Sequence, residues 1–185
     1  MDASENRLVQ LQNTHFLHNW KKVSGEEGYP RYATIKNEFV ALWHKFLDFI
    51  RENKLSEIKL NLWEVTYVNH ICKGEGWNSF EDFHTIFPCL SGKFSDGFLP
   101  VPESVTFKAV FPFPDEKGRL YISADPAIRK SDYAEIIRLT LTARGQITSS
   151  MENALDCLDK GHVWIVKGFT DFTSPQSHAL WQRKE

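Results

Sequence analysis

Four hydrogen-bonding side chains crowd the end of one expected strand and form the sharpest chemical constellation in the sequence. They are Glu64, Tyr67, Asn69 and His70. A desolvated Glu64 would have a raised pKa and could act as a base, while Asn69 and His70 orient a ligand. In the structural alternative, Glu64 pairs with Arg31 or Arg138, and Asn69 bonds backbone at the strand end. The structural interpretation is favoured, because buried ion pairs also perturb pKa values without catalysis.

A second constellation lies on the polar face of a later strand, where Arg138 and Arg144 flank Thr140 and Thr142. If this face is open, it is a solvated surface, which is common in antiparallel sheets. If it curves over a cavity, it could bind an anion or a nucleotide phosphate. Arg31, which lies between two tyrosines, could add to either arrangement.

The motifs of common cofactor and metal sites are missing from the sequence. His70 and Cys72 are separated by one residue, but no C-x-x-C or H-x-x-x-H pair accompanies them. Zinc usually needs three or four ligands in such pairs, so we expect neither a metal nor a cofactor. The G-x-S-x-G, P-loop and G-x-G-x-x-G motifs are also absent.

Composition indicates a globular protein. The chain has 185 residues, 42% hydrophobic and 14% aromatic, with a formal net charge of −2. This predicts a single domain over residues 7–183 after a flexible N-terminus at 1–6. The charge argues against nucleic-acid binding. Three cysteines without pair spacing favour a reduced, cytoplasmic location, and no apolar run is long enough to span a membrane.

The elements that must position these residues follow from hydrophobic spacing. Short strands are expected within 7–20, and further strands near 57–71, 105–113, 120–124 and 137–144. Long amphipathic helices are expected at 34–53 and 149–172, with short helices at 79–87 and from Pro175. The apolar stripe of the second long helix consists of Met151, Leu155, Leu158, His162, Ile165, Phe169 and Phe172.

The strand at 57–71 changes parity part-way. Ile58, Leu60 and Leu62 alternate with polar residues, and then Trp63 and Val65 become the large members. A bulge near Leu62 and Trp63 would place all the large residues on one face and Glu64 on the other, near Arg138. Without a bulge, Glu64 would project into the core and need a partner there.

These elements predict an α+β fold in the order β-β-α-β-(α)-β-β-β-α-α. Mostly short connections favour an antiparallel sheet, and two long helices with single apolar faces would cover one side of it.

Several ordered segments carry a resemblance to a known family. They are 7–12, 16–20, 29–32, the strand motif Glu64 to Ile71 and, at the end, 168–175 with 178–181. Together they resemble a sporadically distributed, functionally uncharacterised bacterial family with a Glu-x-x-Tyr-x-Asn-x-Ile strand. The resemblance implies a bacterial or phage origin and no established activity. Family members are usually longer at the N-terminus, so the chain resembles a shortened member.

We therefore expect a non-catalytic binding module that recognises a protein partner or its own copy, as a homodimer, with no membrane association. The alternative is a small-molecule or nucleotide binding protein, or an enzyme, with a pocket between sheet and helices near Glu64 to His70. The candidate binding residues are Arg31, Glu64, Tyr67, Asn69, His70, Arg138 and Arg144.

Overall fold

The structure is a computed structural model that describes residues 6–23, 27–90, 98–114, 117–147 and 151–182. It divides into two compact units, Met1–Lys59 and Leu60–Glu185. Compactness does not test whether either unit folds alone, so the single domain at 7–183 stays a prediction. All but one residue of the expected flexible N-terminus, 1–6, lie outside the described residues.

The first unit is a hairpin and a long helix. Strands β1 (Arg7–Leu11) and β2 (Phe16–Trp20) pair antiparallel. Helix α1 (Tyr32–Glu52) begins two residues before the expected Thr34, because Arg31 has an extended backbone and serves as the N-cap. Phe16 packs its ring against Trp43 and Phe46, with both ring centroids 5.3 Å away. Aromatic stacking therefore joins the hairpin to the apolar stripe of the helix.

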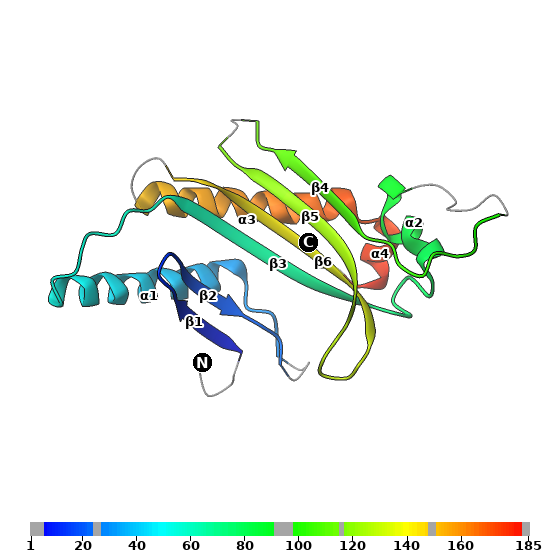
Figure 1. Ribbon diagram of the computed structural model, residues 1–185, viewed down its shortest axis with the longest axis horizontal. Helices are drawn as coiled ribbons and strands as arrows, with labels where there is room; N and C mark the ends of the chain where they lie inside the picture. Colours follow the sequence, from blue (N-terminus) through cyan, green and yellow to red (C-terminus); the bar gives the residue numbers. More distant parts are fainter. Residues whose placement is uncertain (1–5, 24–26, 91–97, 115–116, 148–150, 183–185) are drawn as a thin grey trace. The chain divides into compact units, whose positions relative to one another are not determined.

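The second unit is an antiparallel sheet with the order β3-β6-β5-β4 (Figure 1). Its strands are β3 (Leu62–Cys72), β4 (Phe107–Pro112), β5 (Arg119–Ile128) and β6 (Glu135–Gln146). Helix α3 (Met151–Phe172) packs against β3, β6 and β5. The predicted α+β class and element order are confirmed. The expected single sheet is divided into two, and the two long helices belong to different units.

Strand β3 has no bulge. Its pairing with β6 is unbroken from Leu62 opposite Gln146 to Cys72 opposite Ile136. The strand begins only at Leu62, so Ile58 and Leu60 lie outside the ladder and do not set its parity. Trp63 therefore faces the core, and Glu64 is exposed on the other face. The expectation that an unbulged strand turns Glu64 inward is wrong.

Helix α3 approaches the sheet through small residues. Its buried members are Ala154, Gly161, Ile165 and Phe172, spaced seven, four and seven apart. A Cβ added at Gly161 would lie 2.6 Å from the indole of Trp63, and one at Gly168 would lie 2.5 Å from Leu120. These distances leave no room for a side chain, so the two glycines set the spacing between helix and sheet.

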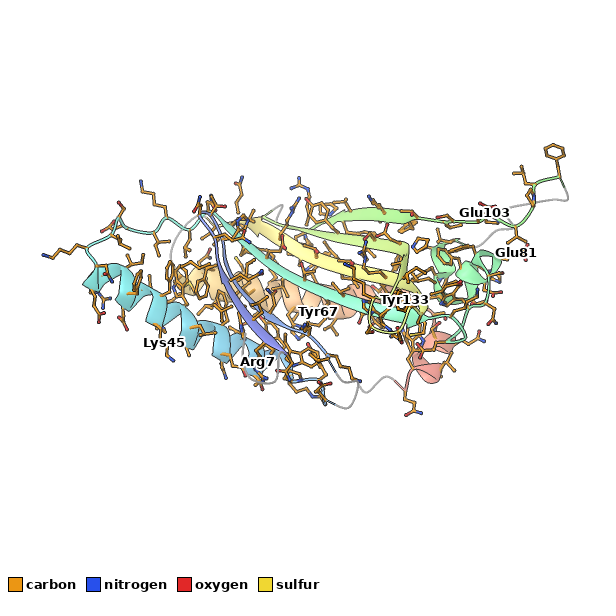
Figure 2. The ribbon with its side chains drawn as sticks, turned by 60° about the horizontal axis from the view of Figure 1, so that its bottom comes forward. Arg7, Lys45, Tyr67, Glu81, Glu103 and Tyr133 are labelled. Carbon is orange, nitrogen blue, oxygen red and sulfur yellow. The ribbon has the colours of Figure 1, made fainter. Side chains whose placement is uncertain are left out.

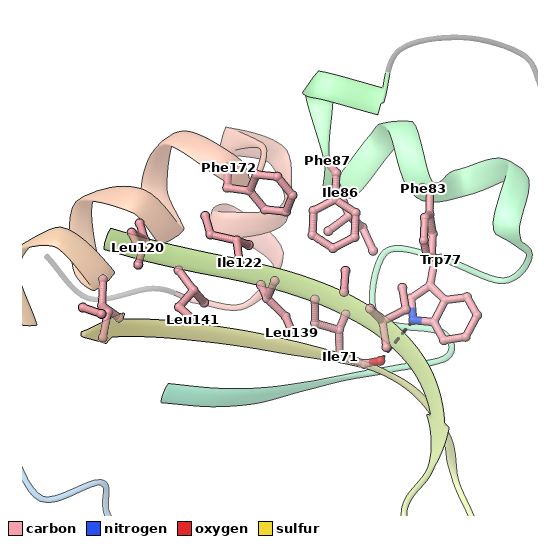
Figure 3. Close-up of a cluster of buried hydrophobic side chains, with 14 of the residues drawn as sticks. Ile71, Trp77, Phe83, Ile86, Phe87, Leu120, Ile122, Leu139, Leu141 and Phe172 are labelled. Atoms are coloured by element: carbon pink, nitrogen blue, oxygen red, sulfur yellow. Dashed lines mark hydrogen bonds between the residues drawn. The ribbon is translucent and has the colours of Figure 1, made fainter. Parts of the chain in front are cut away.

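Short elements close one end of this core (Figure 3). They are η1 (Phe80–Asp82), α2 (Phe83–Ile86), η2 (Pro88–Leu90) and α4 (Pro175–Leu180). Two of these elements have capped starts: Asp82 accepts from the backbone N–H of Ser79, and Ser174 accepts from that of Ser177. The Trp77 indole N–H donates to the Ile71 carbonyl at 3.1 Å, which ties this end to β3.

Candidate functional site

The candidate site is the sheet face opposite the buried side chains that meet α3, here called the open face. Along β6, Ile137, Leu139, Leu141 and Ala143 are fully buried, and the alternate residues point the other way. The cross-strand register extends this alternation to the neighbouring strands. The open face consists of Glu64, Thr66, Val68, His70, Lys108, Val110, Arg119, Tyr121, Ser123, Asp125, Arg138, Thr140, Thr142 and Arg144.

One end of the open face holds two arginines side by side. Arg144 lies directly opposite Arg119 on β5 and opposite Glu64 on β3. Its guanidinium lies over the Tyr121 ring, 4.5 Å from the centroid. Among the residues that the structure describes, neither arginine forms an ion pair. Like charges directly opposite destabilise a sheet, so the fold gains nothing from placing Arg119 and Arg144 side by side.

The other end of the open face holds a histidine beside an arginine. Arg138 lies opposite both His70 and Asp125. Partial burial of its imidazole, followed by the positive charges of Arg129 and Arg138, lowers the pKa of His70. This favours the neutral imidazole, whose ring can donate one hydrogen bond and accept another.

Hydroxyl groups fill the middle of the open face. Thr66 Oγ1 lies 2.9 Å from Thr142 Oγ1 and donates to Glu64 Oε1 at 3.2 Å. Beside them is a hollow of about 150 Å³, lined by Lys108, Ala109, Val110, Tyr121, Ile122, Ser123, Thr140 and Thr142. Small-molecule sites typically measure about 300–1,000 Å³. The hollow is therefore the size of a single side chain or small anion.

The charge of the open face is opposite in sign to that of the chain. The open face carries four cationic side chains and two carboxylates. The cations are Lys108, Arg119, Arg138 and Arg144, and the carboxylates are Glu64 and Asp125. The face thus carries a formal +2, while the whole sequence carries −2. Exposed arginines and hydroxyls favour an acidic binding partner.

The structure brings together four of the seven sequence-predicted residues, namely Glu64, His70, Arg138 and Arg144. Tyr67, labelled in Figure 2, lies on the covered face, where its hydroxyl is 3.0 Å from His162 Nδ1. Asn69 shares the parity of Tyr67 and is also on that face. Arg31 belongs to the first unit, where it is exposed before α1. The strand register sets Glu64 opposite Arg144, six residues along β6 from the expected partner Arg138.

Lys108, Arg119 and Tyr121 are among the residues of this face that the sequence did not single out. The sequence pattern could have indicated them, since Arg119 and Tyr121 alternate with the buried Leu120 and Ile122 and must therefore lie on the opposite face.

A separate cluster lies at the turn between β5 and β6. Arg129 donates to Asp132 through Nε at 2.9 Å and Nη2 at 2.6 Å, and through Nη1 to Cys72 Sγ at 3.3 Å. The Arg129 guanidinium lowers the pKa of Asp132 to about 2. Asp132 also accepts from the Ala134 backbone N–H at 3.2 Å. These bonds hold the turn together, which accounts for the cluster without a ligand.

Among the described residues, no group of three or more His, Cys, Asp or Glu side chains could hold a metal ion. No helix in the described part of the chain has the length and apolar character needed to cross a membrane. No family model, curated protein or solved structure matches the chain. The resemblance to the uncharacterised bacterial family therefore stays a prediction.

Proposed function

We propose that the protein is a non-catalytic binding module whose open face docks an acidic segment of a protein partner. The observation that carries this proposal is the adjacent pair Arg119 and Arg144, which are exposed and form no ion pair within the described residues. A guanidinium binds a carboxylate through two parallel hydrogen bonds. Two of them on neighbouring strands therefore present a receptor for consecutive acidic side chains.

The hollow provides a second contact. A partner side chain that enters it would meet an almost wholly apolar lining, because the Ser123 hydroxyl donates to Asp125 and the Thr142 hydroxyl lies 2.9 Å from that of Thr66. The open face thus offers an arginine pair for carboxylates and, beside it, a small apolar hollow for one neighbouring side chain of the partner.

Spacing argues against the enzyme alternative. Glu64 and His70 are six residues apart on one regular strand, which separates them by about 20 Å at roughly 3.3 Å per residue. A base and an orienting group must both reach one substrate, within hydrogen-bond distance. These two residues therefore do not act together on one small molecule.

The choice of side chains favours a protein over a nucleic acid. Sheets that bind single strands offer several exposed aromatic rings on which bases stack. The open face has one aromatic residue, Tyr121, and the Arg144 guanidinium covers its ring. A phosphate backbone would find cations here, but its bases would find no stacking platform.

The test measures fluorescence anisotropy of labelled probes with the full chain. The probes are a 12-residue peptide of alternating Glu and Ser, a 12-nucleotide oligo-dT and ATP. We expect the peptide to bind most tightly and the double variant Arg119→Ala/Arg144→Ala to weaken it at least tenfold. The matched control is Arg51→Ala on α1, whose side chain is 78% exposed and paired with Asp48. Absence of peptide binding, equal loss in the control, or tighter binding of oligo-dT or ATP would overturn the proposal.

A further inference from the structure

The two edges of the four-stranded sheet differ in how well they are protected. The β4 edge is six residues long and ends at Pro112, whose nitrogen has no hydrogen to donate. The β3 edge is eleven residues long and contains no Gly, Pro or Lys. Its ladder with β6 has no bulge, and Val68 on it is 53% exposed. Natural edge strands are usually shortened or interrupted by such residues, so β3 has the features of a pairing strand.

We propose that a second copy of the chain pairs with this edge, β3 against β3 in antiparallel register, with the two-fold axis at Tyr67. Tyr67 is the midpoint of Leu62–Cys72, so this register alone uses the whole strand on both copies. The proposal concerns the strand edge and stands independently of what the open face binds.

This register is self-complementary on the open face. It places Glu64 opposite His70 of the second copy, and the two-fold axis repeats that contact. Opposed residues in an antiparallel pair have Cβ atoms about 4.5–5.5 Å apart, so the neutral imidazole N–H reaches the carboxylate. Val68 lies opposite Thr66 of the second copy, and part of its exposed surface is covered. The register therefore places a His70 donor opposite a Glu64 acceptor at both ends of the paired β3 strands.

The covered face is matched as well. Trp63 lies opposite Ile71 of the second copy, Val65 opposite Asn69, and Tyr67 opposite its own equivalent. Shifting the axis by one residue to Thr66 or Val68 shortens the ladder to nine residues on each copy. It also opposes Glu64 to Val68, or Thr66 to His70, and the carboxylate loses its donor. The axis at Tyr67 is thus favoured by both length and charge.

Assembly in this way has one geometric result. A two-fold axis perpendicular to the sheet joins two four-stranded sheets into one of eight strands. Both open faces then lie on the same side, with the β4 edges at the two outer ends. The β3 edges are paired in the assembly, and the Pro112-bearing edges remain as its borders.

The first experiment is sedimentation velocity of the full chain from 1 to 100 µM. We expect a species of about 43 kDa, twice the 21.5 kDa of the chain. Val68→Lys and Val110→Lys form a matched pair, because the two valines are 53% and 52% exposed and lie on opposite edge strands. Val68→Lys should weaken the dimer at least tenfold, and Val110→Lys should leave it unchanged. A monomer throughout, or equal effects of the two variants, would overturn the proposal.

The second experiment fixes the register and does not depend on a destabilising variant. Glu64→Cys and His70→Cys chains are mixed in equal amounts and oxidised, and linked peptides are identified by mass spectrometry. We expect a disulfide that joins the cysteine introduced at position 64 of one chain to the cysteine introduced at position 70 of the other. This bond should form in excess of any made by the native Cys72, Cys89 and Cys157, for which the native chain is the control. Thr66→Cys or Val68→Cys alone should form no bond with itself, and efficient self-linking of either would place the axis elsewhere.

Discussion

Gly161 of α3 faces the indole of Trp63 with no space between them for a methyl group. Trp63 is 4% exposed, and glycines at 118 and 145 border its ring on the other sides. The large indole of Trp63 is thus enclosed by three glycines, which have no side chains. This contact, rather than the apolar stripe, determines how closely α3 approaches the sheet.

Gly161→Ala should destabilise the protein by about 1–3 kcal/mol, the usual cost of overpacking a filled core. The added Cβ would lie 2.6 Å from Trp63 and 3.2 Å from Ala143. Helix propensity alone predicts the reverse, since Ala is favoured over Gly by about 1 kcal/mol. Urea denaturation measures the difference, with Gly28→Ala as control because nothing lies within 4 Å of its added Cβ. A stabilised Gly161→Ala variant would contradict this packing.

Truncation variants along α3 should distinguish the members of the expected apolar stripe that reach the core from those that do not. Ile165 is 1% exposed, so Ile165→Ala should lower the free energy of unfolding by about 2–5 kcal/mol. Leu155 lies outside the core cluster, so Leu155→Ala should lower the free energy of unfolding by about 1 kcal/mol or less. Chemical denaturation of the two variants under identical conditions gives the comparison. Equal losses would mean that both sides of the helix are equally packed.

Acid should weaken the first unit through Glu38. Arg7 Nε and His18 Nε2 both contact Glu38 Oε2, at 2.9 and 3.0 Å. The Arg7 hydrogen bond is the main cause that lowers the pKa of Glu38. Its contribution to stability is present above the unfolded pKa of about 4.3 and is lost as pH falls through the lower folded value.

Glu38→Gln should therefore reduce the drop in melting temperature between pH 6 and pH 3, as followed by circular dichroism. Asp48→Asn is the control, because its ion pair with Arg51 is exposed and contributes little. The same acid-induced drop in Glu38→Gln and in the native chain would show that this carboxylate does not stabilise the unit.

His162 should make the second unit sensitive to mild acid. Burial lowers the pKa of His162, with a smaller opposing effect of Asp159. The neutral form is favoured by folding, so stability is full above the unfolded pKa of about 6.5 and declines as pH falls below it. His162→Gln should show a smaller loss of unfolding free energy from pH 7.5 to 5.5. His44→Gln on the exposed side of α1 should keep the native loss, and an unchanged slope in His162→Gln would contradict the assignment.

Strict period-2 segments were the most predictable part of the fold. The alternation of Ile137, Leu139 and Leu141 with Arg138 and Thr140 predicted both the strand and its two faces. Side-chain polarity reports burial directly when one face is wet and the other dry. The helix caps at Ser79 and Ser174 were predictable for a similar reason, since each depends on residues within one turn.

Long-range features were not predictable from the pattern. The segment before Leu62 alternates like a strand but lies outside the ladder, so the phase of β3 was misjudged. Gly161 and Gly168 carry no hydrophobic signal, although they determine the helix–sheet contact. The candidate site was found only in part, because Arg119 and Arg144 meet through the register between β5 and β6, although they are 25 residues apart in the sequence. Register between strands depends on tertiary packing, which a single sequence does not display.

The strand order β3-β6-β5-β4 has a consequence for synthesis. β3 leaves the ribosome first of these four strands, but its neighbour β6 ends only at Gln146. At about 5–20 residues per second, the 74 residues after Cys72 take on the order of 4–15 s to translate. Throughout that interval β3 is a half-apolar strand on a nascent chain that still lacks its partner strand. Its exposure to chaperones, or to β3 of a chain on the same polysome, is therefore governed by the speed of elongation.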